Sequence, residues 1–92
     1  MWYLYILRCS DGSLYTGVTT DVARRLKQHR AGRGSKALRA KLPIRLVYKE
    51  KHPTRSASQK REAEIKRWNH KKKQALVHRK NRRGLCYNQT NR

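Results

Sequence analysis

Acidic residues are scarce in this sequence. Five Asp and Glu stand against 25 Lys and Arg, which gives a formal net charge of +20. A catalytic site that binds two metal ions generally needs several carboxylates, so this composition argues against two-metal chemistry. A single Mg²⁺ ion needs less from the protein, because phosphate and water oxygens can complete its coordination shell. The sequence therefore leaves room for a site with one metal ion.

Cysteine is rare as well, and Cys9 and Cys86 lie far apart in the chain. No C-x-x-C spacing exists, which argues against a zinc site. We expect two reduced thiols in a cytoplasmic protein. Long apolar runs are also missing, since no segment is typical of a membrane helix or a signal peptide. We therefore expect no membrane association.

Positive charge is what the sequence has in abundance. A small domain with a net charge of +20 repels itself, so a counter-charged partner is the natural explanation. Nucleic acid is the favoured partner, and an anionic membrane is the rival. The 92 residues, 36% of them hydrophobic, allow one thin core. We expect a monomer with one domain over residues 1–78 and a basic, disordered tail over residues 79–92.

Three segments are typical of β-strands. Residues 2–9 carry aromatic and β-branched side chains on both alternating faces, which predicts a central strand. Turn residues at 10–13 lead into a second strand over 14–18, in which Gly17 indicates a bulge or the close approach of another group. A third strand is predicted over 44–49, where alternation places three apolar side chains on one face: Ile44, Leu46 and Tyr48.

Helix signals follow the second strand. A helix is predicted to begin at Thr20 or Asp21, whose side chains can accept its free N–H groups, and to stop near Gly32. Val22 supplies part of its packing stripe. A short helical turn is expected over residues 36–40.

A second long helix is predicted to begin at Ser56, because Ser56 and Gln59 form a capping-box pattern. An interruption at 69–70 precedes a resumed helix over 71–77, with Ala75 and Leu76 facing the core. The order is strand, strand, helix, short helix, strand, helix. This order predicts an α+β fold around a small antiparallel sheet.

Tyr5 and Tyr15 form the first candidate constellation, because they lie on adjacent predicted strands. A free phenol has a pKa of about 10, and nearby cations favour its ionised form. A tyrosine surrounded by Arg and Lys could thus accept a proton from water. The alternative is that both are ordinary aromatic residues of a β-sheet.

Arg25 and His29 form the second constellation, because residues at i and i+4 share one face of a helix. An Arg whose stem packs near the core can present its planar guanidinium to a phosphate. The alternative is a solvated basic face.

Glu62 and Glu64 form the third constellation. Of the five acids, Asp11 serves a turn, Asp21 serves a helix start and Glu50 ends a strand, so only these two glutamates remain for metal binding. The alternative is that they form surface ion pairs with neighbouring cations such as Lys66.

Four segments in this order resemble the GIY-YIG nuclease superfamily, specifically its small stand-alone bacterial members. Leu4-Tyr5-Ile6 stands where the family has its first tyrosine element, and Leu14-Tyr15-Thr16-Gly17 stands at its second. Residues 24–29 are similar to its arginine helix, and residues 61–68 to its glutamate helix. The sequence departs from the pattern at two of these positions, with Tyr3 in place of the first Gly and Thr16 in place of an Ile.

The resemblance implies a metal-dependent endonuclease that acts on DNA. Tyr5 and Tyr15 would position and deprotonate the attacking water, Arg25 would stabilise the phosphate, and Glu62 would hold one Mg²⁺ or Mn²⁺. His29 would contact phosphate or assist proton transfer. The family's fold is a three-stranded antiparallel sheet flanked by helices, in agreement with the order predicted from the residues.

Basic residues on the same segments would contact the nucleic acid: Arg24, Lys27, Arg33, Lys36 and Lys66. The alternative function is a non-catalytic nucleic-acid-binding module on the same fold, since fold alone does not guarantee activity.

Overall fold

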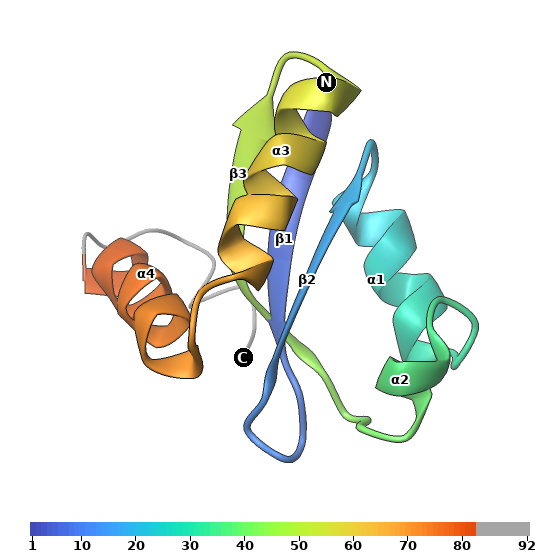
Figure 1. The fold of residues 1–92 in the computed structure, drawn as a ribbon. Coiled ribbons are helices and arrows are strands. Elements are labelled where there is room, and N and C mark those ends of the chain that lie inside the picture. The colour runs from blue at the N-terminus through green and yellow to red at the C-terminus, as the bar shows by residue number, and fades with distance from the viewer. Residues whose placement is uncertain (83–92) are drawn as a thin grey trace.

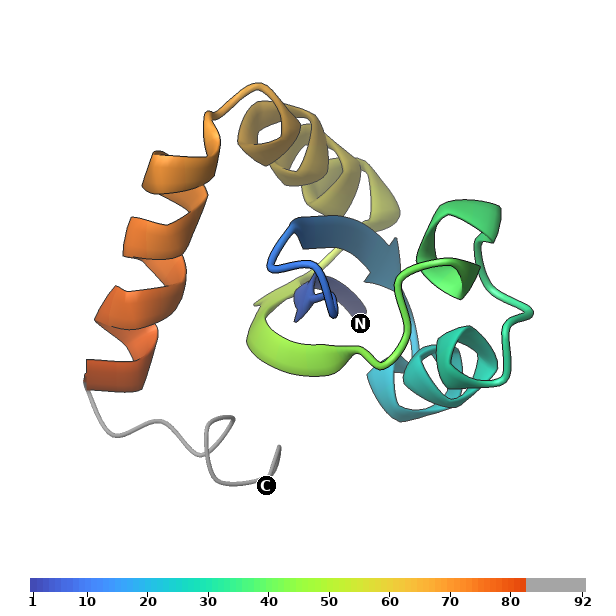
Figure 2. The same cartoon turned by 90° about the horizontal axis from the view of Figure 1, so that it is seen from below.

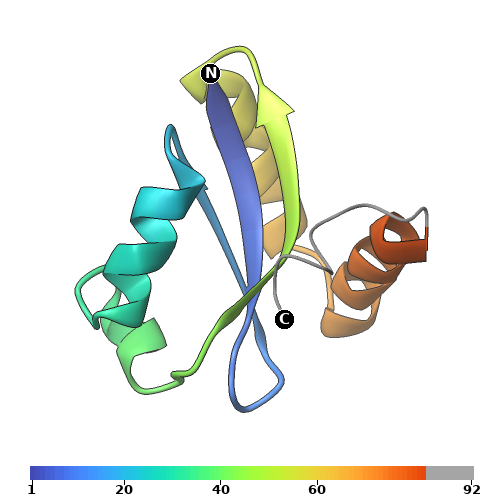
Figure 3. The same ribbon diagram turned by 180° about the vertical axis from the view of Figure 1, so that it is seen from behind.

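The computed structural model describes residues 1–82. Its centre is a sheet of three antiparallel strands: β1 (Trp2–Arg8), β2 (Leu14–Thr19) and β3 (Arg45–His52). The strand order is β2-β1-β3, with β1 in the middle, as Figure 3 shows from behind. The prediction of an α+β fold with a central first strand is confirmed. The physical reason is that β1 carries buried apolar side chains on both faces.

Four helices surround this sheet (Figure 1): α1 (Val22–Arg30), α2 (Lys36–Arg39), α3 (Arg55–Lys66) and α4 (His70–Arg82). Figure 2 shows the strands enclosed between α4 on one side and α1 with α2 on the other. Among residues 1–82, no helix is both long and apolar enough to cross a bilayer.

Two hydrophobic clusters divide the core. One joins Tyr5, Leu7 and Leu46 to residues of α1 and α2. The other joins Leu4 and Ile6 to residues of β3, α3 and α4. Alternate side chains of β1 therefore supply the two clusters, which is the arrangement that its alternating apolar pattern requires.

The third strand differs from the predicted alternation. Its pairing with β1 shifts between Ile6 and Leu7, so that Val47 is an extra residue opposite this step. Val47 and Tyr48 consequently belong to the same cluster, whereas Leu46 belongs to the other. The prediction that Leu46 and Tyr48 share a face was wrong, because a β-bulge places two successive side chains on one side.

Helix caps confirm one predicted start and correct another. Asp21 caps α1, since its Oδ1 accepts a hydrogen bond of 3.1 Å from the N–H of Arg24. Helix α3 does not begin at Ser56: Thr54 is the cap, and its Oγ1 accepts from the N–H of Ala57 at 3.1 Å. Thr54 satisfies the first free N–H groups, so the helix begins before the capping-box pattern.

Helix α4 begins at His70, one residue earlier than predicted, and Asn69 Oδ1 accepts from the N–H of Lys72 at 2.8 Å. Its core contact is Val77, which is wholly buried, while Ala75 is exposed. The inward orientation predicted for Ala75 was therefore wrong, because the helix packs on the core through Val77 and the partly buried Leu76. The helix continues to Arg82, and residues 83–92 of the predicted tail, with Cys86, lie outside the described residues. Cys9 is a free, buried thiol.

Candidate active site

Tyr5 and His29 form a buried pair at the centre of the candidate site. The phenol oxygen of Tyr5 lies 2.9 Å from Nε2 of His29. Tyr5 is 2% exposed and His29 is 0% exposed. The pair forms because β1 directs Tyr5 toward the face that α1 covers, and the last turn of α1 carries His29 there. His29 therefore contacts Tyr5 and does not reach the solvent.

Gly17 makes room for this tyrosine. Tyr5 and Gly17 are paired across β1 and β2, and a Cβ at Gly17 would lie 2.6 Å from the Tyr5 hydroxyl oxygen. The close approach predicted from Gly17 is thus confirmed, and the approaching group is the candidate catalytic phenol. The ring of Tyr15 on β2 completes an aromatic cluster, with centroids 6.5 Å from Tyr5 and 5.5 Å from His29.

The other ring nitrogen of His29 determines its tautomer. Among the described residues, Nδ1 of His29 is buried and has no hydrogen-bond partner. Gly34 seals this side, since a Cβ there would lie 2.1 Å from Nδ1. Because a buried N–H without an acceptor is rarer in folded proteins than an unpaired acceptor, we place the proton on Nε2. In this tautomer His29 donates to the oxygen of Tyr5.

Burial controls the charge of both partners. It raises the pKa of Tyr5 to about 12, although a hydrogen bond from Arg25 acts in the opposite direction. Burial, and then the charge of Arg25, lower the pKa of His29. The free protein therefore holds a neutral phenol beside a neutral imidazole. The expectation that surrounding cations would favour phenolate does not hold here, because desolvation of the charged form outweighs their attraction.

Arg25 is fixed by two acceptors. Its Nη1 donates to Oε1 of Gln28 at 3.1 Å, and its Nη2 donates to the backbone oxygen of Gly34 at 3.3 Å. Both contacts are partly buried, so the guanidinium is held in one orientation. Arg25 also borders a cavity of about 340 Å³, together with Trp2, Arg24, Gln28, Arg55 and Gln59.

Sequence reasoning found Arg24 and Arg25 but missed the other polar residues of the cavity. Gln28 could have been found, because it lies three residues after Arg25 on the same helix face. Arg55 and Gln59 come from the start of α3, which is remote in sequence. Only the packing of α1 and α3 on either side of β2, visible in Figure 1, brings them together.

Glu62 lies on α3, and its charge contributes to raising the pKa of Tyr5. Its side chain is 22% exposed, and its carboxylate forms an ion pair of 3.3 Å with Nζ of Lys66. The ion pair considered as the alternative role of Glu62 is therefore present. Among the described residues, no cluster of three or more His, Cys, Asp and Glu side chains exists. One partly exposed carboxylate suits a Mg²⁺ or Mn²⁺ ion that takes its remaining oxygens from water and phosphate.

The remaining basic candidates are dispersed. Lys27, Arg33, Lys36 and Lys66 are exposed, on or near α1, α2 and α3. The structure thus brings Tyr5, Tyr15, Arg25 and His29 into direct or neighbouring contact, and it leaves these cations at the periphery.

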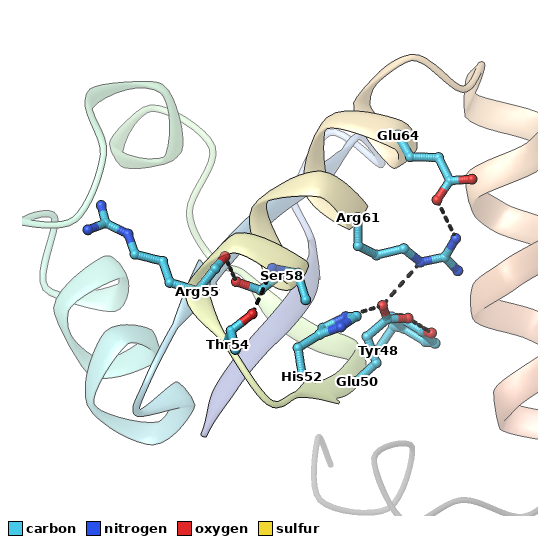
Figure 4. A network of polar contacts seen from close by, with 9 residues as sticks. Tyr48, Glu50, His52, Thr54, Arg55, Ser58, Arg61 and Glu64 are labelled. Atoms are coloured by element: carbon cyan, nitrogen blue, oxygen red, sulfur yellow. Dashed lines mark hydrogen bonds and ion pairs between the residues drawn. The ribbon is translucent and has the colours of Figure 1, made fainter.

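A second polar network was not predicted. Glu50 lies within β3, and Figure 4 shows Tyr48, His52 and Arg61 directed at its carboxylate. Arg61 in turn contacts Glu64 at 2.8 Å. Hydrogen bonds from Tyr48 and His52 and the charge of Arg61 hold the pKa of Glu50 below its usual value, although burial alone would raise it. No pattern in the sequence indicated this network, because its members come from β3 and α3.

Comparison with known proteins agrees with this geometry. The GIY-YIG catalytic domain matches residues 1–75. A UPF0213 protein of Streptococcus sanguinis is 51% identical over 75 residues, which cover 82% of this chain and 86% of the relative. A UPF0213 protein of Haloquadratum walsbyi is 54% identical over 75 residues, covering 82% and 84%.

A solved structure is similar in fold as well. The solution NMR structure of a UPF0213 protein from Bacillus halodurans matches with a TM-score of 0.57 and 46% identity, covering 87% of this chain and 86% of that one. The family match therefore covers the segments that carry the candidate tyrosines, arginine and glutamate. The chain belongs to the GIY-YIG catalytic domain family.

Proposed function

We propose that this protein is an endonuclease that hydrolyses phosphodiester bonds in DNA, with one Mg²⁺ or Mn²⁺ ion held by Glu62. The observation that supports the proposal most is the buried hydrogen bond between Tyr5 and His29, close to the fixed guanidinium of Arg25. Gly17, opposite Tyr5 on β2, leaves the space that the Tyr5 hydroxyl occupies. We further propose that the protein is a cytoplasmic monomer.

Tyr5 is the group that accepts a proton from the attacking water. Its pKa of about 12 keeps it neutral in the free protein, so Tyr5 must first release its own proton to solvent before it can accept one from water, and a divalent cation nearby would favour that release. His29 and Arg25 both act on its oxygen, and hydrogen bonds donated to a phenolate stabilise it. Tyr15 neighbours this pair and positions the water.

Arg25 binds the phosphate in the transition state. Its two acceptors hold the guanidinium beside the cavity, and a preorganised cation stabilises developing negative charge without a reorganisation cost. Arg24 and Arg55 border the same cavity and bind neighbouring phosphates of the strand. Lys27, Arg33, Lys36 and Lys66 extend this contact as exposed, salt-sensitive charges.

A bound divalent cation would act as a Lewis acid that neutralises charge on the phosphate. Glu62 is the residue that would hold it, after release of its ion pair with Lys66. Lys66 is then free to contact the nucleic acid.

The alternative function is a non-catalytic nucleic-acid-binding module. Two observations favour it: the pairing of Glu62 with Lys66 and the neutral state of Tyr5. Both observations describe the protein without its substrate. An assay for DNA cleavage therefore has to distinguish the two functions.

The decisive assay incubates the purified protein with branched, single-stranded and duplex DNA, with and without Mg²⁺ or Mn²⁺. Glu62→Gln is nearly isosteric, so we expect cleavage to fall by orders of magnitude while DNA affinity holds or rises. Tyr5→Phe should behave in the same way, because only the phenol oxygen is removed.

Glu64→Gln is the matched control, since it removes a carboxylate from the same helix. Its side chain is exposed and pairs with Arg61, on the flank of α3 opposite to Glu62, so cleavage should change little. Full activity of Glu62→Gln beside an inactive Glu64→Gln would refute the assignment of the ligand. A wild-type protein that cleaves no substrate with either metal would support the binding module.

A further inference from the structure

The carboxylate of Glu50 is the meeting point of three donors (Figure 4). The hydroxyl of Tyr48 donates to Oε1, while Nε2 of His52 lies 2.6 Å and Nε of Arg61 lies 3.1 Å from Oε2. Only 17% of the Glu50 side chain is exposed. One of five acids in a chain with 25 cations is thus committed to a network that contains none of the candidate catalytic groups.

The bulge in β3 is what places this network under α3. After the extra residue Val47, side chains alternate again, so that Tyr48, Glu50 and His52 lie on one face of the strand. Tyr48 belongs to the cluster that also contains Ile65 of α3. Without the bulge, a shift of one residue would turn Glu50 toward the opposite face of the sheet.

Helix α3 carries Arg61 and Glu62 on the two sides of its buried stripe. Ser58 and Ile65, about two turns apart, are both 0% exposed and face the sheet. At about 100° per residue, Arg61 and Glu62 fall on opposite flanks of the line that joins them. Arg61 reaches Glu50 on β3, whereas the charge of Glu62 acts on Tyr5.

We propose that Glu50 is a positioning residue: by holding Arg61 it fixes the rotation of α3 about its axis, and thereby holds Glu62 in place at the candidate active site. The inference rests on the proposed function, in which Glu62 is the metal ligand. Glu50 touches neither substrate nor reacting atoms and acts through the helix.

The geometry is sensitive to rotation. Side-chain ends lie about 5–6 Å from a helix axis, so a roll of about 10° moves the Glu62 carboxylate by about 1 Å. A misplacement of about 1 Å can lower a catalytic rate by about 10²-fold. The exposed partner of Arg61, Glu64, cannot replace Glu50, because it lies on α3 itself and moves with it.

The test is Glu50→Gln, which keeps the shape of the side chain and removes its charge. Mn²⁺ binding is followed by paramagnetic broadening of the amide signals of α3, a readout that does not depend on cleavage. We expect the Mn²⁺ dissociation constant to rise by about tenfold or more and kcat to fall by about 10–100-fold. The KM for DNA should stay within about twofold, because the DNA-binding cations are unchanged.

Two further single variants and one double variant separate positioning from general stability. Glu64→Gln removes the other carboxylate bound to Arg61 and should leave Mn²⁺ binding and kcat unchanged. Arg61→Lys keeps the charge but loses Nε, and it should reproduce Glu50→Gln even if that variant folds poorly. On a Glu62→Gln background, Glu50→Gln should lower kcat no further, because both act through one carboxylate.

Unchanged Mn²⁺ binding in Glu50→Gln and in Arg61→Lys, with a lower melting temperature, would show that the network only stabilises the fold. In that outcome the proposed function survives and the positioning role fails. A wild-type protein that neither binds Mn²⁺ at α3 nor cleaves DNA would overturn both.

Discussion

Gly17→Ala is the substitution that tests the candidate site most directly. The added Cβ would lie 2.6 Å from the hydroxyl oxygen and 2.7 Å from Cζ of Tyr5. To reach ordinary van der Waals contact, the hydroxyl must retreat from 2.6 Å to about 3.4 Å, a shift of about 0.8 Å. Tyr5 is 2% exposed and bound to His29, so it has little space in which to retreat.

Two consequences follow for the variant. Overpacking of a well-filled core costs about 1–3 kcal/mol, so the free energy of unfolding should fall by that amount. Displacement of a reacting group by about 1 Å can lower a rate by about 10²-fold, so cleavage should fall far more than folding. DNA affinity should remain near that of the wild type, because no cation is removed.

The assay combines thermal unfolding, DNA binding by anisotropy and single-turnover cleavage. Gly12→Ala is the control: Gly12 has a φ of +85° and no atom within 4 Å of an added Cβ. An Ala in the left-handed region costs about 1–2 kcal/mol, which matches the expected stability loss without touching Tyr5. The control should therefore unfold more easily and still cleave at the wild-type rate.

The reasoning fails if Gly17→Ala cleaves as fast as the wild type, since Tyr5 would then be dispensable or free to move. It also fails if Gly12→Ala loses as much activity as Gly17→Ala, since stability alone would then explain both losses.

Three further predictions concern charge, pH and the chain end. With about five phosphates neutralised, log K for duplex DNA should fall against log salt with a slope of roughly −4 to −5, and an affinity independent of salt would contradict the electrostatic account. The pKa of Tyr5 is raised from 10.0 to about 12 on folding, so the neutral phenol stabilises the fold below pH 10. That stability is lost as the pH rises toward 12, and melting curves over this range should fall less for Tyr5→Phe than for the wild type. Equal losses would show that Tyr5 does not carry the effect. A chain that ends at Arg82 should keep its melting temperature, because the core residues of the described region precede residue 78. It should bind DNA less tightly, because residues 83–92 contain two arginines. A large drop in helical circular dichroism or melting temperature would show that the removed segment stabilises the fold.

The sequence by itself determined the order of the elements and named the candidate catalytic residues. Apolar side chains on both faces of residues 2–8 required a central strand, and the pair Thr20 and Asp21 marked the start of α1, where Asp21 is the cap. A glycine inside a strand pointed to a close approach, and the group that approaches it is Tyr5. These signals depend on neighbours within a few positions or across one hairpin, so local propensity and periodicity are sufficient to read them.

Only the tertiary structure decided the environment of those residues. A single bulge at Val47 turned Glu50 toward α3, and no alternation pattern in the sequence marks it. The pKa of Tyr5 rose rather than fell, because its burial depends on how α1 and β2 enclose it. Arg55 joined the cavity beside Arg25 from a distant helix. Burial and contacts between elements depend on how residues far apart in the chain pack together. They cannot be inferred from neighbours in the sequence.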